Sequence, residues 1–251
     1  MTAFTYRMPA GIPGAITRSE FSLVEGGVLD TTNPPATFGI PMVIDASSHN
    51  YRSVIANDLS SAIVAMYVRP YPMQGNGTDG LGTSTPPTSG VCNAMKFGYM
   101  SVKLNGATAA TKGGAVYART ANPSSGKPVG GLEAAAEVTV AGGTITGTGT
   151  GTIAASVTAA ALIGTWALTL QSTSQTSKVT VIDPNGLRHP DATVGTAYTS
   201  GDLTFTITAA GTMTAGDSFA PVVTTNTILV PNSYFNGPAD ANGNTELVFN
   251  I

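Results

Sequence analysis

The sequence predicts an all-β protein, and three observations lead to this fold class. Charged residues make up 10% of the 251 residues, far below the roughly 25% of an average soluble domain. The chain carries 30 glycines and 16 prolines together with abundant threonine, a composition expected of short strands joined by tight turns. Hydrophobic residues reach 42%, which argues against a disordered chain. The length is sufficient for one large or two modest domains with a buried core.

The clearest strand pattern lies in the second half of the chain. Valines alternate with polar residues in 179–182, and apolar residues alternate in the same way in 203–207, so each strand has one apolar face. After the first of these strands, Asp183-Pro184-Asn185-Gly186 combines a proline of fixed φ with a glycine that is free to take a positive φ. This run predicts a tight turn.

The first 130 residues contain most of the arginines, tyrosines, prolines and methionines. Their pattern predicts several strands, one irregular loop and a terminal linker. The strands are the apolar run 62–68, which Arg69-Pro70 stops, and the segments 95–104 and 115–118; the loop is 74–90, and the linker is 122–131.

A change of composition divides the chain into two domains. Residues 132–224 are dominated by Ala, Thr, Gly and Val, whereas 227–231 and 246–251 return to the style of the first part. The simplest organisation is a discontinuous base domain, 1–131 plus 225–251, with a β-sandwich, 132–224, inserted through a surface loop. Such insertions are tolerated where the ends of the host strands lie close together.

The search for catalytic groups yields no candidate. His49 and His189 are interpreted as loop residues, since no partner carboxylate or second ligand lies at a useful spacing. Cys92, the single cysteine, is typical of a small buried hydrophobe. The turn at 183–186 lacks the further acids of a calcium loop, and the Gly-Thr alternation at 147–152 lacks the Gly-Lys-Ser/Thr of a phosphate cradle. We therefore expect a flexible or extended loop at 147–152, no catalytic residue, no cofactor, no metal and no enzymatic activity.

Charge and hydropathy also exclude other partners. The net charge is −3 and no Lys/Arg run is present, so we expect no nucleic-acid partner. Residues 152–170 carry no charge, but they are rich in Ala and Thr, interrupted by Gly164 and surrounded by strand patterns. They predict strands rather than a membrane span. The segment 1–7 lacks the apolar core of a secretory signal.

An N-terminal arm, residues 8–18, is the candidate interface. It contains two prolines and two glycines among few charges, so it suits neither a helix nor a central strand. In an extended chain at about 3.3 Å per residue, Ile12 and Ile16 lie roughly 13 Å apart on the same side. We predict a docking arm whose contact residues are Ile12, Pro13, Ile16 and Arg18; the alternative is a solvated terminus.

These features together resemble the capsid cement, or head decoration, proteins of tailed phages. The resemblance lies in the arm 8–18, the block 21–44, the strand 61–70 and the short C-terminal strand. Separately, residues 151–223, through the segments 183–186, 192–200, 203–207 and 215–219, resemble a β-sandwich module that is inserted in head decoration proteins.

This resemblance implies a structural role. It predicts an all-β fold with a β-barrel or jelly-roll-like base domain that binds the capsid and an inserted, outward-facing Ig-like β-sandwich. The expected place is the outer surface of the virion, and the expected partners are the major capsid protein and further copies of the chain, as a homo-dimer or homo-trimer at a capsid symmetry axis. The expectation includes no nucleic-acid partner and no membrane.

A second hypothesis is a carbohydrate-binding adhesin or tail-fibre module. Sandwich loops can present aromatic and acidic side chains to sugars, and Trp166, Tyr198 and Asp202 are the candidates. However, Trp166 alternates in phase with Leu168 and Leu170, which favours packing in the core.

Overall fold

The computed structural model describes residues 11–70, 85–200 and 202–251. The predicted all-β fold is confirmed: within these residues the only helical elements are two 3-10 turns, η1 (Ser19–Phe21) and η2 (Ser60–Ala62). Residues 1–10, which include the start of the predicted arm, and residues 71–84, which include the part 74–84 of the predicted loop, lie outside the described residues. The chain forms two compact units: unit 1 comprises 1–136 and 227–251, and unit 2 comprises 137–226.

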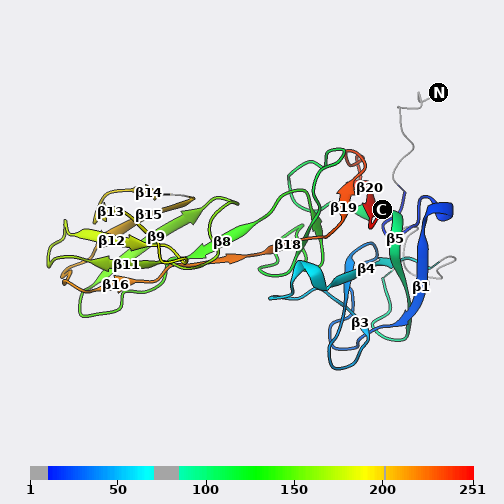
Figure 1. Cartoon of the computed structure of the whole chain (residues 1–251), viewed down its shortest axis with the longest axis horizontal. Coiled ribbons are helices and arrows are strands. Elements are labelled where there is room, and N and C mark those ends of the chain that lie inside the picture. The colour runs from blue at the N-terminus through cyan, green and yellow to red at the C-terminus, as the bar shows by residue number, and fades with distance from the viewer. Residues whose placement is uncertain (1–10, 71–84, 201) are drawn as a thin grey trace. The chain divides into compact units, whose positions relative to one another are not determined.

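Unit 1 contains a seven-stranded antiparallel sheet and a three-stranded one (Figure 1). In the larger sheet the order is β19-β20-β5-β4-β2-β3, and β1 also pairs with β5; the smaller sheet has the order β18-β6-β7. The strands are β1 (Leu23–Val28), β2 (Pro41–Ile44), β3 (Tyr51–Ser53), β4 (Ile63–Val68), β5 (Val91–Lys103), β6 (Tyr117–Arg119), β7 (Leu132–Glu133), β18 (Thr227–Leu229), β19 (Ser233–Phe235) and β20 (Asn244–Phe249).

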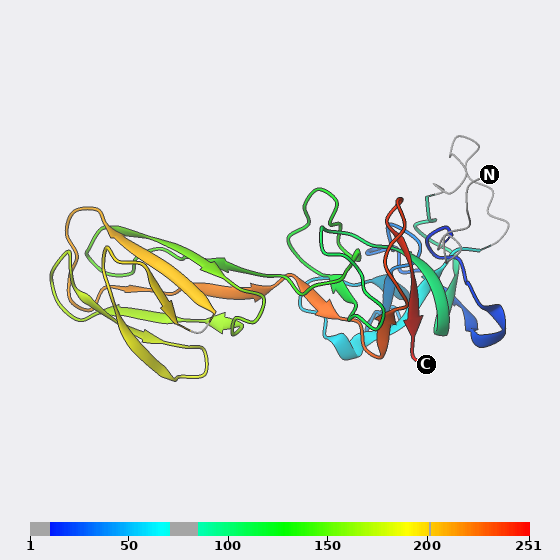
Figure 2. The ribbon, with the colours of Figure 1, turned by 90° about the horizontal axis from the view of Figure 1, so that it is seen from above.

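Strand β5 is the centre of the larger sheet. Its first half pairs with β1 and β4, and its second half, from Gly98 onward, pairs with β20. The C-terminal strand β20 lies beside β5 in both views (Figures 1 and 2). Apolar side chains of β4, β5 and β20 pack with those of the smaller sheet in one core, and a second core gathers around Tyr51, Tyr67 and Cys92.

Unit 2 is a β-sandwich with one core. Sheet β13-β12-β11-β16 and sheet β14-β15-β9 contribute Leu168, Val181 and Phe205 to the same apolar cluster, and sheet β10-β17-β8 adds Val223. The strands are β8 (Val138–Ala141), β9 (Gly151–Val157), β10 (Gly164–Thr165), β11 (Ala167–Leu170), β12 (Lys178–Ile182), β13 (Arg188–Thr193), β14 (Tyr198–Ser200), β15 (Leu203–Ala209), β16 (Ser218–Phe219) and β17 (Val222–Thr225).

The Gly-Thr alternation before β9 forms a fixed loop around a buried acid. Asp217 is 3% exposed, and its carboxylate accepts the backbone N–H groups of Thr148 and Thr214 at 2.9 and 2.7 Å. A Cβ atom on Gly147 or Gly149 would lie 2.0 or 2.2 Å from that carboxylate. Glycine is therefore needed here so that the backbone can approach Asp217 closely.

A buried ion pair moves the start of unit 2 beyond the predicted boundary at 131/132. Arg119 of β6 is fully buried, and its Nε lies 2.7 Å from Glu133 Oε1 of β7. Lys127 Nζ lies 3.4 Å from the other oxygen of Glu133. Residues 132–136 therefore belong to unit 1, although their composition is that of the segment that follows.

The two chain crossings between the units lie next to each other. Asn226 N–H donates to the carbonyl oxygen of Glu137 at 2.8 Å, and its side-chain amide donates to the carboxylate of Glu137 at 3.0 Å. The adjoining strands β8 and β17 are antiparallel partners. On the unit 1 side, β7 and β18 flank the same strand, β6. A short link can therefore join 136 to 227.

We predict that two deletions of similar length have opposite effects. Removing 137–226, with Ala136 joined to Thr227 through two glycines, leaves unit 1 folded and cooperative in thermal unfolding. Removing 132–224, with Gly131 joined to Thr225, takes away Glu133 and leaves Arg119 buried without this carboxylate, which costs about 3–5 kcal/mol of folding free energy.

The substitution Glu133→Ala in the full chain is the matched test of that cost, measured by chemical denaturation of unit 1. Glu20→Ala, which removes an exposed acid of the same unit, is the control and should change stability far less. If unit 1 were equally stable in the two deletion variants, the result would contradict the boundary at 136/137.

Candidate functional site

The candidate arm makes a tight turn instead of running extended. Ala15 N–H donates to Ile12 O at 3.0 Å, and Gly14 has φ +84°. Proline at the second position and glycine at the third are the residues that a type II turn requires. The predicted extended spacing of Ile12 and Ile16 is therefore wrong, because the Pro13-Gly14 pair between them reverses the chain.

After this turn the arm is hydrogen-bonded to its own unit. Gly14 N–H donates to Ser101 O at 2.8 Å, Ser101 N–H donates to Ala15 O at 2.9 Å, and Thr17 N–H donates to Tyr99 O at 3.1 Å. The carbonyl of Gly14 accepts Arg69 N–H at 2.8 Å. A Cβ atom on Gly14 would lie 2.5 Å from Phe38 Cβ. The arm thus occupies the backbone groups of β5 beside the end of β4.

The four predicted contact residues divide into two pairs. Ile16 packs against the core of unit 1. The guanidinium of Arg18 lies 4.1 Å from the centre of the Tyr99 ring, and its Nη2 lies 3.0 Å from Glu246 Oε2. By contrast, Ile12 is 37% exposed and Pro13 lines a surface pocket. Ile12 and Pro13 are therefore placed to meet another molecule, and the Arg18 side chain, which is 42% exposed, remains partly accessible beside its partners in unit 1.

Glu246 holds the arm to β20, and sequence reasoning missed it. Its carboxylate accepts hydrogen bonds from Thr17 Oγ1 at 2.6 Å, from Arg18 and from Asn236. Burial raises the pKa of Glu246, but these hydrogen bonds outweigh burial and hold the pKa below its usual value of 4.5. No local pattern could have found this contact, because Glu246 and Arg18 lie 228 residues apart in the sequence.

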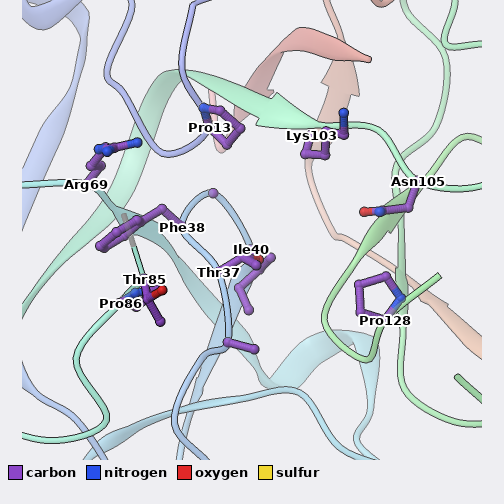
Figure 3. A pocket seen from close by; sticks show the side chains of 12 residues that line it. Pro13, Thr37, Phe38, Ile40, Arg69, Thr85, Pro86, Lys103, Asn105 and Pro128 are labelled. Atoms are coloured by element: carbon purple, nitrogen blue, oxygen red, sulfur yellow. The ribbon is translucent and has the colours of Figure 1, made fainter. Parts of the chain in front are cut away.

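A pocket of about 250 Å³ opens beside the arm (Figure 3). It is formed entirely by unit 1, between the arm, the segment before β2, the ends of β4 and β5 and the predicted linker. Its lining residues are Pro13, Ala36, Thr37, Phe38, Gly39, Ile40, Arg69, Thr85, Pro86, Lys103, Asn105 and Pro128.

The pocket combines apolar walls with positive charge. Phe38, Ile40 and the prolines supply the apolar surface, while Arg69 and Lys103 are the charged residues among the described residues of the lining. The Arg69 guanidinium lies 5.7 Å from the centre of the Phe38 ring. Such a site suits an apolar group next to a carboxylate. No His, Cys, Asp or Glu is found among the described residues of the lining.

The interpretation of His189 as a loop residue without a carboxylate partner is wrong. His189 lies in β13, with Nδ1 2.8 Å from Ser200 Oγ and Nε2 3.4 Å from Asp183 Oδ2. The turn at 183–187 folds back and brings Asp183 to the ring, a contact that linear spacing does not reveal. Asp183 also accepts the backbone N–H groups of Asn185 and Leu187 at 2.9 and 2.8 Å. The hydrogen bonds among Asp183, His189 and Ser200 therefore hold the turn at 183–187 in unit 2.

Trp166, the tryptophan of the carbohydrate hypothesis, is buried and cannot meet a sugar. Trp166 is 1% exposed and stacks 5.3 Å from the His189 ring, so its predicted place in the core is confirmed. Tyr198 packs on Phe205 and donates to Pro190 O at 2.7 Å. Asp202 accepts a hydrogen bond from Thr158. Each side chain thus has a partner within unit 2.

Cys92 lies in the core, and burial raises the pKa of its thiol. Within residues 11–70, 85–200 and 202–251, no group of three or more His, Cys, Asp or Glu side chains is arranged to hold a metal ion. In that same part of the chain, no helix has the length and apolar character needed to cross a membrane.

Residues 1–164 match the family model described as XM1 gp53 minor capsid protein, and the chain belongs to this family. It is therefore a phage capsid protein with a structural role in the virion. No curated protein and no solved structure matches the chain.

We predict that acid weakens the attachment of the arm through Glu246. Because its folded-state pKa lies below the unfolded value of about 4.5, the stabilisation is fully present above that value and is lost as the pH falls through the folded pKa. The free energy of unfolding of the unchanged chain should therefore exceed that of Glu246→Gln at neutral pH, and the difference should shrink below about pH 4.5.

Chemical denaturation of both proteins across this pH range measures the effect. Glu20→Gln is the control, since Glu20 is an exposed acid of the same arm region and its removal should produce no such difference. A gap between the unchanged chain and Glu246→Gln that is constant with pH would refute the assigned role of this carboxylate.

Proposed function

We propose that this chain is a cement, or decoration, protein that binds the outer surface of the major capsid protein lattice and stabilises the head. The observation that carries the proposal is the family match over residues 1–164, which includes the whole N-terminal part of unit 1. The role is non-enzymatic and involves neither nucleic acid nor a membrane. It operates through many copies, because modest interfaces repeated on a symmetric lattice add up to a large stabilisation.

Unit 1 is the proposed capsid-binding part. Arg69 and Lys103 line its pocket beside apolar walls, as does Pro13, and Ile12, the neighbour of Pro13 in the chain, is exposed. We assign to it a segment of the major capsid protein that carries an acidic side chain next to an apolar one. A volume of about 250 Å³ is small for a free ligand but suits an anchoring side chain.

Unit 2 is the proposed outward-facing part. It has its own core, and the two crossings that join it to unit 1 are closed by hydrogen bonds between Glu137 and Asn226. This organisation supports an accessory module that is carried by the base and is not needed for capsid attachment. Copies of the base are proposed to gather as a homo-dimer or homo-trimer at a capsid symmetry axis.

We predict that the purified chain binds mature capsids that lack it, at a fixed stoichiometry, in a co-sedimentation experiment. Lys103→Glu should weaken this binding roughly tenfold or more, because a charge-assisted contact becomes a repulsion. Lys112→Glu is the matched control, since Lys112 is an exposed lysine of the same unit outside the pocket lining, and it should bind as the unchanged chain does.

The two parts of the proposal can fail separately. Absence of binding by the unchanged chain would overturn the cement role itself. Binding that Lys103→Glu and Lys112→Glu affect equally would retain the cement role and exclude the pocket as the contact.

A further inference from the structure

Strand β1 presents an open edge in unit 1. Within the described residues, Leu23–Val28 pairs with β5 along one edge (Figure 1). Leu29 N–H donates to Gly90 O at 2.9 Å, and antiparallel partners alternate, so Gly27 and Glu25 also bond toward β5. The backbone groups of Val24 and Gly26 therefore point to the opposite edge. Within the described residues, no other segment forms a backbone hydrogen bond with them at that edge.

The length of this open edge is limited by β3. Asp30 N–H donates to Tyr51 O at 2.8 Å, and Leu29 bridges Tyr51 in parallel, so β3 covers the edge beyond Val28. The Tyr51 ring also lies against Gly27, where an added Cβ would approach it to 2.4 Å. One face of β1 is thus covered by Tyr51, and the open edge comprises the four backbone groups of Val24 and Gly26.

The other face of β1 is apolar and exposed. Val24 and Val28 lie on this face, and Val91 of β5 is the cross-strand neighbour of Val28. Val28 is 49% exposed and Val91 is 77% exposed. The exposed apolar side chains of β1 and the first half of β5 are Leu23, Val24, Val28, Val91 and Phe97. An apolar surface next to an unpaired strand edge marks a site for strand addition.

Apart from a register irregularity between Leu23 and Val24, β1 has little of the usual protection of an edge strand. Strand β1 contains no lysine and no proline, and its single charge is Glu25. Lys96 Nζ lies 3.0 Å from Glu25 Oε1, and Tyr51 Oη donates to the same carboxylate. The edge is therefore electrically neutral and would gain little from a strongly acidic or basic partner strand.

We infer that β1 is a self-association strand, which pairs antiparallel with β1 of a second copy about a two-fold axis at Glu25. In this register Val24 lies opposite Gly26 of the second copy, and their N–H and C=O groups form four hydrogen bonds, which satisfy all four open backbone groups on each chain. The two Glu25 carboxylates meet with two Lys96 ammonium groups, so the four charges cancel. A second copy fits because it brings the same short neutral edge and the same valine face.

This pairing does not depend on capsid binding, so it is tested on the isolated chain. Sedimentation equilibrium should show a concentration-dependent dimer of twice the 25.3 kDa chain mass. Gly26→Pro removes an outward N–H and hence two of the four hydrogen bonds, which should raise the dissociation constant roughly tenfold or more. Gly26→Ala keeps the N–H, and its Cβ meets no atom within 4 Å, so it should dimerise like the unchanged chain.

A second pair of variants tests the same edge in case Gly26→Pro does not fold. Val24→Lys places a charge at the edge and should also abolish dimerisation, whereas Leu59→Lys makes the same change at a remote site that is 70% exposed and should leave it intact. Circular dichroism and thermal unfolding establish that each variant folds.

Three results would overturn the inference. The first is that the unchanged chain is a monomer at every concentration. The second is that it forms a trimer, which two-fold strand pairing cannot produce. The third is that Val24→Lys folds and dimerises like the unchanged protein. Capsid binding by a monomeric chain would leave the cement proposal standing without the strand pairing.

Discussion

Strand β5 shares its backbone hydrogen bonds with four segments of unit 1, and its 13 residues determine where each of them lies. Along one edge β1 pairs with its first half and β20 with its second half. Along the other edge β4 pairs first, and the arm follows at Tyr99 and Ser101. A change in β5 would therefore displace the arm, the pocket and the edge strand together.

The change of partner within β5 occurs at Gly98, and the reason is steric. Gly98 has φ +137°, and a Cβ atom on it would lie 2.1 Å from Ser22 Oγ. That hydroxyl donates to Arg18 O at 2.9 Å and accepts Tyr99 N–H at 3.3 Å. Glycine thus leaves room for Ser22, which joins the arm to β5 where β1 ends and β20 begins.

Local chemistry predicted much of the fold and less of the site. Alternation at 179–182 and 203–207 marked buried faces correctly, because the period of two is a local property of a strand. The unit boundary shifted because composition cannot reveal that Glu133 neutralises Arg119 across β6 and β7. The arm differs from its predicted extended form for another reason: Pro13-Gly14 has the residues of a type II turn, and Ala15 N–H closes that turn on Ile12 O.

The contacts that sequence reasoning missed are those between segments distant in the chain or brought together by a turn. Glu246 meets Arg18 only because β20 and the arm share β5. Asp183 reaches His189 only because the chain reverses between them. In both cases one carboxylate accepts hydrogen bonds from several donors. Such an arrangement fixes the backbone geometry, which is a structural role and not a catalytic one.

The polar groups of the arm are hydrogen-bonded within unit 1. Two other surfaces of unit 1, the pocket and the edge of β1, are candidates for contact with other molecules. The pocket places Arg69 and Lys103 beside apolar walls, and within the described residues β1 leaves the backbone groups of Val24 and Gly26 at an open edge. The two surfaces have different chemistry, one cationic with apolar walls and one neutral and strand-like. They therefore favour different partners. A protein that bridges neighbouring subunits of a shell needs two such surfaces, since a single surface can only coat the shell.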